Sequence, residues 1–320
     1  MKQIIIIALL TGGPCFGGVD DKNVAVMQME IKELKTSFSL GFGYFQATAD
    51  EIVYGGSSES GELSHLVWKT QDALTVEGGF RHSLSACLDT YADFTTALVD
   101  QGQMVDDDWL GSGTQWTDRS IHNDTELDAY CRIDAGVEWT FLERESSAYS
   151  ALFGFRYIDI AWTARGGSYV YSTDPDGGLF RDERGSFPPD EKGISYQQKL
   201  PGLYLGPQAE WTSGRVNLRA AAIGGVTIGA SDIDQHWAQN TQFEEKFDSQ
   251  VFFELSLALR YQLTKSLSYF IDGRYEQYEL MKGSIQFTDL STGESETYNG
   301  DAAGAQFGSW QIQMGLEVSF

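Results

Sequence analysis

Apolar and polar residues alternate one by one along several stretches of the chain. The last residues, WQIQMGLEVSF, place six apolar side chains on one parity and polar or small residues on the other. The same alternation recurs in KTSFSLGFGYF, CRIDAGVEW and VFFELSLALRYQL. Because successive side chains of a β-strand point to opposite faces, each stretch predicts a strand with one apolar face and one polar face.

The charges on the polar faces distinguish a membrane barrel from a soluble sandwich. Arg132, Asp134 and Glu138 all lie on one such face. A soluble sandwich would bury these charges in its core and expose rows of Leu and Phe to water, and both arrangements are unfavourable. In a membrane barrel the apolar faces contact lipid, the charges pair in the lumen, and closure satisfies every backbone group. The pattern therefore predicts an all-β fold, a transmembrane antiparallel β-barrel.

About ten strands are expected from the alternating segments. They lie near residues 35–54, 62–80, 86–105, 122–142, 147–171, 193–212, 215–233, 249–264, 266–288 and 306–320. Short links such as WTSGR alternate with long polar links such as DGGLFRDERGSFPPDEKG, which places the short turns in the periplasm and the long loops outside. Charged lumen side chains fill the bore of a barrel of this size, which disfavours a pore for small molecules.

The N-terminal residues MKQIIIIALLTGGPCFGG have the pattern of an export signal. A single Lys2 precedes an apolar run from Ile4 to Leu10, and small residues follow. This order is typical of a cleaved signal peptide. We therefore expect a signal peptide at residues 1–18 and a single outer-membrane barrel domain at residues 19–320.

Composition narrows the partners and the chemistry of the chain. The formal net charge of −24 argues against nucleic acid, because a phosphate backbone binds basic surfaces. The same charge favours basic ligands or substrates. No apolar run is long enough for a transmembrane helix. Cys87 is expected to face the lumen and Cys131 the lipid, so no disulfide between them is predicted.

Two acidic clusters lie where predicted strands run into external loops. In VDDDW, Asp106 and Asp108 share a face, and in SDIDQHW, Asp232, Asp234 and His236 share a face. A histidine beside a carboxylate is typical of a general base held in orientation. The facing aspartates could hold a water and raise the basicity of the imidazole. Together these groups could activate water against a peptide carbonyl.

Other interpretations of the clusters remain open at this point. The same carboxylates and imidazole could bind a metal ion, or they could form a solvated acidic mouth that binds cationic ligands without catalysis. A serine mechanism could use Ser120 with His122 or His236, although Ser120 lacks the sequence around a nucleophile turn.

Strict alternation creates one difficulty for both clusters. Counted up from the membrane segments, Asp106 and Asp234 fall on the lipid-facing parity. Each strand therefore needs one extra residue, a β-bulge, to turn its cluster inward. We expect these bulges at Gly102 and at Gly224–Gly225, because glycine in a strand often marks a bulge.

The chain resembles the omptins, outer-membrane endopeptidases of Gram-negative bacteria. The segment MVDDDW fits the family's Asp-x-Asp-Trp element, and SDIDQH fits its Ser-Asp-x-Asp-x-His element. The segments LSHLVWK, QWTDRSIHNDTEL, TARGGSYVYS and FRDERGSFP are also similar to omptin segments and occur in the family's order. The resemblance covers nearly the whole chain after the predicted signal peptide.

The resemblance implies a ten-stranded barrel that extends outward beyond the membrane, with an aspartic-type endopeptidase site in its outer cleft. Asp106 and His236 would activate the water, Asp234 would orient the histidine, and Asp108 would support the water site. The substrates implied are peptides or proteins with basic residues. No metal or cofactor is expected, and a monomer is expected.

The residues that match the family's specificity carboxylates are Glu51 and Asp232. Glu51 shares its parity with Gly41, Gly43 and Phe45, the inward face of the first predicted strand. A buried carboxylate pair would select Arg or Lys by charge complementarity.

The resemblance also implies a lipopolysaccharide site on the outer surface of the barrel. The family has Tyr, Glu and Arg at alternate positions there, whereas this chain has Phe155, Tyr157 and Asp159. The basic member is missing, which argues against the usual dependence on lipopolysaccharide. Lys199 stands where a further basic residue is expected and is the candidate lipid-binding residue; Arg156 and Lys199 are otherwise interpreted as plain surface charges.

Overall fold

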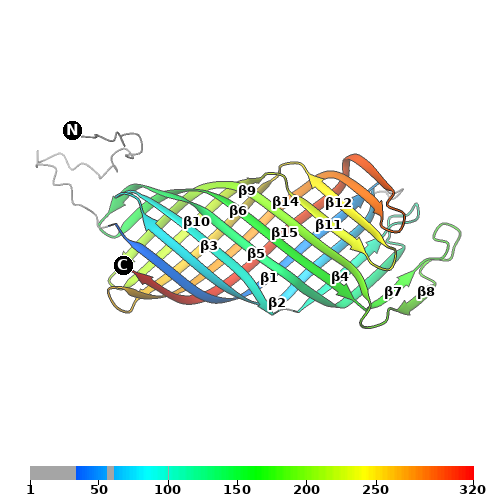
Figure 1. Cartoon of the computed structure of the whole chain (residues 1–320), viewed down its shortest axis with the longest axis horizontal. Coiled ribbons are helices and arrows are strands. Elements are labelled where there is room, and N and C mark those ends of the chain that lie inside the picture. The colour runs from blue at the N-terminus through cyan, green and yellow to red at the C-terminus, as the bar shows by residue number, and fades with distance from the viewer. Residues whose placement is uncertain (1–33, 56–60, 100) are drawn as a thin grey trace, which may run out of the picture.

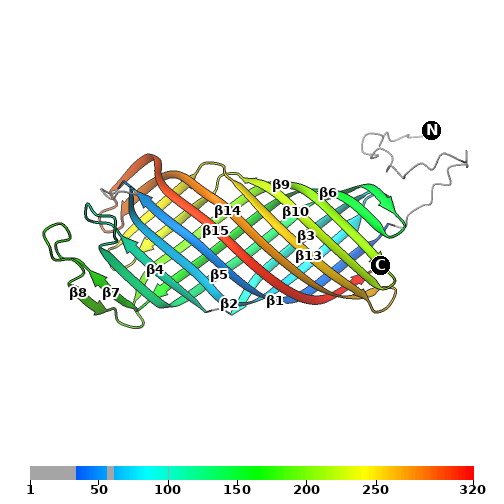
Figure 2. The same ribbon diagram turned by 180° about the vertical axis from the view of Figure 1, so that it is seen from behind.

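The first and last strands of the chain pair with each other and close the sheet into a barrel. The computed structural model describes residues 34–55, 61–99 and 101–320. Strand β1 (Thr36–Tyr54) pairs with β15 (Ser295–Ser319) on one side and with β2 (Glu62–Ser83) on the other. All pairings are antiparallel, and the wall is a ring of ten strands (Figures 1 and 2). The predicted fold class is therefore confirmed.

Several strands of the wall are interrupted part of the way up. The other wall strands are β3 (Leu88–Val99), β4 (Gly102–Asp108), β5 (Asp118–Arg144), β6 (Ser147–Arg165), β9 (Lys192–Ser213), β10 (Val216–Thr227), β11 (Ser231–His236), β12 (Thr241–Phe247), β13 (Val251–Gln262) and β14 (Leu267–Asp289). The successive pairs β3 and β4, β10 and β11, and β12 and β13 each continue one barrel strand. No helix in the described ranges is long and apolar enough to cross a membrane.

Some predicted boundaries are wrong at the outer end. The strand expected at 147–171 ends at Arg165, where Gly166 and Gly167 adopt positive φ angles of 52° and 102°. Residues beyond them form the hairpin of β7 (Ser168–Tyr171) and β8 (Glu183–Ser186), which projects from the end opposite the C-terminus (Figure 1). The last strand begins at Ser295, well before the predicted residue 306. Long polar links that were expected to be loops thus continue the wall.

The outer surface of the barrel carries a belt of exposed apolar side chains. Phe38, Leu40 and Phe42 are exposed on β1, and matching residues are exposed on β13 and β15. The rings of Tyr44 and Trp310 lie 5.3 Å apart at the upper edge of this belt, as expected of the aromatic girdle of a membrane barrel. Wall segments beyond the girdle extend outside the membrane.

The lower lumen is filled by an ionic network. Arg132 lies 2.6 Å from both Asp134 and Glu254. Arg156 lies 2.8 Å from Asp134, 2.7 Å from Glu254 and 3.1 Å from Glu276. The interpretation of Arg156 as a surface charge is therefore wrong: its neighbours in sequence point outward, so its own side chain points inward and is buried.

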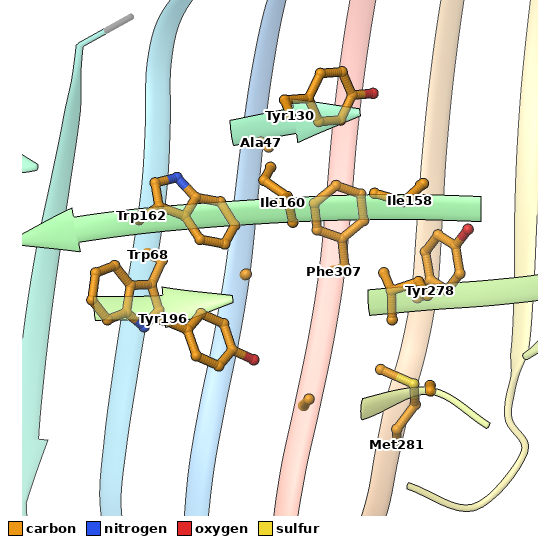
Figure 3. Packing of buried hydrophobic residues seen from close by; sticks show 14 of the residues in the cluster. Ala47, Trp68, Tyr130, Ile158, Ile160, Trp162, Tyr196, Tyr278, Met281 and Phe307 are labelled. Atoms are coloured by element: carbon orange, nitrogen blue, oxygen red, sulfur yellow. The ribbon is translucent and has the colours of Figure 1, made fainter. Parts of the chain in front are cut away.

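A layer of apolar and aromatic side chains lies above the ionic network. Trp68 stacks on Tyr196 at 5.6 Å and on Trp162 at 6.1 Å between ring centroids (Figure 3). Tyr278 and Phe307 pack beside them in the same cluster. This layer separates the ionic network from the outer end of the lumen.

The inward parity changes at the interruptions. On the β3–β4 strand it changes below Gly102, where Val99 pairs with Leu74 but Ala97 pairs with Thr75, so Leu98 is the extra residue. The bulge predicted at Gly102 is therefore wrong in position: the register shift beside Gly102 places its extra residue on β5, between His122 and Thr125. The predicted bulge at Gly224–Gly225 is wrong, because β10 keeps a regular register through both residues. There Gly225 makes room for the Phe252 ring, whose Cζ would lie 2.3 Å from a Cβ at that position, whereas a Cβ on Gly224 would meet open space.

The shift on this strand occurs instead between β10 and β11. Thr227 pairs with Gly202 and Ser231 with Lys199, so one extra residue is accommodated on the β10–β11 strand. Gly229 adopts a φ angle of 68° in this segment, a left-handed conformation that glycine tolerates without strain. The result is the inward rotation that the acidic cluster of β11 requires.

Cys87 and Cys131 are not joined by a disulfide. Cys87 is buried and Cys131 is half-buried, so the prediction of no disulfide between them is confirmed. The predicted signal peptide lies outside the described residues.

Replacing Arg156 with Met should destabilise the barrel by about 3–5 kcal/mol, because the buried carboxylates around it would keep only one guanidinium partner. Urea unfolding in detergent, followed by tryptophan fluorescence, measures this loss. Arg144→Met, at an exposed position near the end of β5, is the matched control and should unfold near the wild-type midpoint. Equal midpoints for the two variants would contradict the stabilising role of the network.

Candidate active site

A cleft of about 540 Å³ opens at the outer end of the lumen, between β4–β5 on one wall and β11 on the other. Asp106 and Asp108 line one side, Asp234 and His236 line the other, and Glu51 of β1 lies at the base. The structure therefore brings together the four side chains that the sequence proposed as catalytic. Their roles remain predictions.

The β4–β5 wall presents pairs of polar side chains to the cleft. Asp106 lies directly opposite Ser120, and Asp108 lies opposite Asp118. The Ser64 hydroxyl donates to Asp106 Oδ1 at 3.3 Å. Burial, followed by the charge of Asp108, raises the pKa of Asp106 well above its usual range, and burial raises that of Asp108 to about 6. These carboxylates are unusually basic for aspartates.

The β11 wall holds an imidazole against a carboxylate. His236 Nε2 lies 2.7 Å from Asp234 Oδ2, and the carboxylate is almost fully buried, whereas 20% of the imidazole is exposed. Burial alone would lower the pKa of His236, but the charges of Asp234, Asp106 and Asp108 outweigh it and raise the pKa to about 9. Because the aspartates of the opposite wall contribute to this shift, both walls act on one electrostatic site.

The two specificity candidates lie at different depths. Glu51 lines the cleft and accepts a hydrogen bond from Trp68 Nε1 at 3.2 Å. Asp232 does not line the cleft: it lies two residues below Asp234 on β11 and accepts a hydrogen bond from the Tyr196 hydroxyl at 2.7 Å. Burial raises the pKa of Glu51 well above its usual range and that of Asp232 to about 7.

The lipid-binding candidate Lys199 lies away from the cleft, on the outer face of β9. It pairs in register with Asp159 of β6. Asp159 accepts hydrogen bonds from Gln197 at 2.6 Å and from the Tyr157 hydroxyl at 3.2 Å. The acidic side chain that replaces the family's basic residue is thus held by its neighbours on the outer surface.

A serine–histidine pair also lines the cleft. Ser120 Oγ lies 2.9 Å from His122 Nε2, and both side chains are buried. The His122 ring stacks on Phe187 at 5.4 Å, and burial lowers the pKa of His122. Among the side chains that the structure describes, no carboxylate is hydrogen-bonded to this imidazole, so the arrangement lacks the third member of a serine triad.

Sequence reasoning missed two buried acids near the site. Asp118 of β5 lines the cleft opposite Asp108. Glu245 of β12 lies opposite Asp232 of β11 and is 1% exposed. Its segment, TQFEEKF, was assigned to a long external loop. The alternation of Phe243, Glu245 and Phe247 with polar residues could have indicated a strand with Glu245 on the inward face.

No metal site accompanies these groups in the part of the chain that the structure describes: no three His, Cys, Asp or Glu side chains are arranged to hold an ion.

Comparisons with known proteins agree on one family. A sequence model of the Omptin family matches residues 32–320. The outer membrane protease OmpP of Escherichia coli K12 is 28% identical over 89% of this chain and 90% of its own length. The plasminogen activator of Yersinia pestis is 27% identical, over 87% of each chain. The crystal structure of the outer membrane protease OmpT from Escherichia coli superposes with a TM-score of 0.82 at 25% identity, covering 89% of this chain and 97% of that one.

Replacing Asp108 with Asn should lower the pKa of His236 below its wild-type value of about 9, because one of the charges that raise it is removed. The titration of ¹³C-labelled histidine in detergent measures this pKa, and the spectrum of His236→Ala assigns the signal. Asp107→Asn is the matched control, since Asp107 pairs with Arg119 instead. An unchanged pKa in Asp108→Asn would show that the two walls are electrically independent.

Proposed function

The chain belongs to the omptin family of outer-membrane proteases, and we propose that it is an endopeptidase that cleaves beside basic residues with an activated water. The observation that carries this proposal is the convergence of Asp106, Asp108, Asp234 and His236 on one cleft. A substrate peptide would lie across this cleft, outside the membrane, with its scissile carbonyl between the two walls.

In this mechanism the water is held between Asp106 and His236. Neutral His236 accepts the proton of the water as the oxygen attacks the carbonyl carbon, and Asp234 holds the imidazole in position from 2.7 Å. Asp106 orients the water, and Asp108 supports the water site. His236 then donates the proton to the leaving amine, so the protein forms no covalent bond to the substrate.

A basic substrate side chain assists this chemistry in two ways. It finds a carboxylate at the base of the cleft in Glu51, with Asp232 beneath, so charge complementarity selects Arg or Lys. Its positive charge also opposes the imidazolium form of His236, which lowers the pKa of that ring. Binding of the correct substrate therefore produces the neutral base.

A serine mechanism is the second candidate, favoured by the 2.9 Å separation of Ser120 and His122. In that mechanism Ser120 would attack the carbonyl and His122 would take its proton. The absence of an orienting carboxylate on His122 among the described residues argues for the water mechanism. A non-catalytic acidic mouth would require net charge but no histidine beside Asp234.

We propose that the protein is a monomer and that it does not depend on lipopolysaccharide through the patch around Asp159. A lipid phosphate there would meet a carboxylate already held by Gln197 and Tyr157, with Lys199 as its neighbour in register. Comparing the activity of refolded protein with and without added lipopolysaccharide tests this part of the proposal. A strict requirement would contradict it.

On a fluorogenic Arg-Arg peptide, Asp106→Ala and His236→Ala should each lower kcat/KM by about 10²-fold or more, the usual contribution of a general base. Ser120→Ala should retain most of the activity. Activity that survives both of the first two substitutions would remove the water mechanism, and total loss in Ser120→Ala would favour the serine mechanism. A chelator should have no effect; inhibition that zinc reverses would instead indicate a metal site.

The pH dependence of the reaction should differ between the free enzyme and the complex. The imidazole is protonated and inactive below its pKa, so kcat/KM should rise with pH towards the free-enzyme value of about 9. The rise in kcat, which reports the complex, should lie at lower pH because the substrate cation disfavours imidazolium. Steady-state kinetics between about pH 5 and 10 measure the pH dependence of both kcat/KM and kcat. A rise in kcat at higher pH than the rise in kcat/KM would contradict the mechanism.

A further inference from the structure

The barrel contains two groups of buried carboxylates, and only one group has its counter-ions built in. In the lower lumen, Asp134, Glu254 and Glu276 are paired with arginines at 3.5 Å or less. Near the cleft, Glu51, Asp232 and Glu245 are at most 2% exposed. Within the described ranges, no Lys or Arg side chain forms an ion pair with any of these three.

Three of the upper polar side chains form a row beneath the cleft. Asp232 of β11 lies directly opposite Gln198 of β9 on one side and Glu245 of β12 on the other. Directly opposed residues of an antiparallel pair have Cβ atoms about 4.5–5.5 Å apart, and like charges at that position repel. Asp232 and Glu245 therefore oppose each other at close range within the protein interior.

The row also has more hydrogen-bonding capacity than the protein uses. Among the described residues, no donor group is bonded to Gln198 Oε1, Asp232 Oδ1 or the carboxylate oxygens of Glu245, and no acceptor is bonded to Gln198 Nε2. Asp232 and Glu245 can hydrogen-bond to each other only by sharing a proton. Gln198 is fully buried, and its amide is independent of the acidic cluster. Buried polar atoms of native proteins almost always have partners. The acceptor oxygens of this row therefore indicate a missing donor, whereas Gln198 Nε2, itself a donor, is not satisfied by one.

We propose that Glu245 is a further specificity-determining residue, the third carboxylate of a pocket in which the row of Gln198, Asp232 and Glu245 receives a substrate guanidinium. This inference rests on the proposed function and deepens it by naming arginine as the preferred side chain. Glu51 and Asp234 border the entrance to the row from the cleft, and the other described neighbours that face Glu245 are Tyr196 of β9 and Ile285 of β14.

The depth and the chemistry of the row both favour arginine. Asp232 lies two strand residues below Asp234, about 7 Å, so only a long side chain reaches it. A guanidinium presents five N–H donors in a fixed planar fork, whereas an ammonium presents three donors on a point charge. The unpartnered oxygens of Asp232 and Glu245 come from two neighbouring strands. They therefore match the spread N–H donors of a guanidinium better than the single nitrogen of an ammonium group.

The test compares Glu245→Gln with Glu244→Gln in the full-length refolded protein. Glu244 is the adjacent residue on β12 and is exposed on the outer face, so it is matched in charge and sequence but not in position. Each variant is assayed on three peptides that differ only in one residue: arginine, lysine or citrulline, the neutral analogue of arginine. KM and kcat are determined separately.

Glu245→Gln should raise KM for the arginine peptide about tenfold and raise it less for the lysine peptide, with kcat little changed. The preference for arginine over lysine should fall accordingly, while Glu244→Gln should match the wild type on all three peptides. Competitive inhibition by agmatine, a small guanidinium compound, should weaken by a similar factor in Glu245→Gln alone.

The outcomes separate this inference from the proposed function. A wild-type protein that cleaves no basic peptide would remove the proposed function itself. Cleavage by the wild type with an unchanged arginine-to-lysine ratio in Glu245→Gln would overturn only the role of Glu245. An equal loss of kcat on all peptides, with agmatine inhibition unchanged, would also overturn it, because that result reflects a purely structural role.

Discussion

Lipid supplies no hydrogen-bond partner to a peptide backbone, and this constraint determines the whole architecture. The wall must close, and it does so where β1 pairs with β15 along nearly its full length. Once closed, the wall has one face for lipid and one for the lumen, so the charges of the ionic network and the four proposed catalytic side chains lie inside. The same wall then continues past the aromatic girdle, which raises the cleft above the membrane.

The lumen contains three successive layers that treat charge differently. In the lowest layer, Arg132 and Arg156 form ion pairs with the acids around them. The aromatic layer of Trp68, Trp162 and Tyr196 excludes water. Above it, in the described part of the chain, Glu51, Asp232 and Glu245 form no ion pair with Lys or Arg, and burial raises their pKa values. The nearby charges of Asp234, Asp106 and Asp108 raise the pKa of His236. The carboxylates beside the cleft therefore have raised pKa values, and a cationic substrate side chain could supply the positive charge that they lack.

Much of the fold could be predicted from the sequence because alternation is a direct record of which face meets lipid. The exposed belt of Phe38, Leu40 and Phe42 and the inward Glu51 both follow from parity. The pairing of Asp234 with His236 also follows from their spacing. Prediction was less successful beyond the membrane, where the outer face is polar and the contrast between faces is lost. For that reason the strand that carries Glu245 was assigned to a loop, and the start of β15 was placed too late.

Two errors have a common physical origin in backbone features that leave little trace in composition. A bulge is predicted at Gly224–Gly225, whereas Gly225 instead leaves room for the Phe252 ring. The surface position predicted for Arg156 is wrong because its ion partners include Glu254 and Glu276, which come from the non-adjacent strands β13 and β14. Neither a ring packing across strands nor a long-range ion pair is visible in local spacing.

The change of inward parity between Thr227 and Ala230 has a broader meaning for how such a molecule can vary. Below this point odd-numbered residues of the strand face inward, and above it even-numbered residues face inward, so the membrane-spanning part and the cleft part have independent alternation. Substitutions in one section therefore need not change which side chains face inward in the other, because the extra residue near Gly229 accommodates the difference in register. A homologous protein could therefore change the side chains that face the cleft, and with them its substrate, without altering the membrane-spanning part of the barrel.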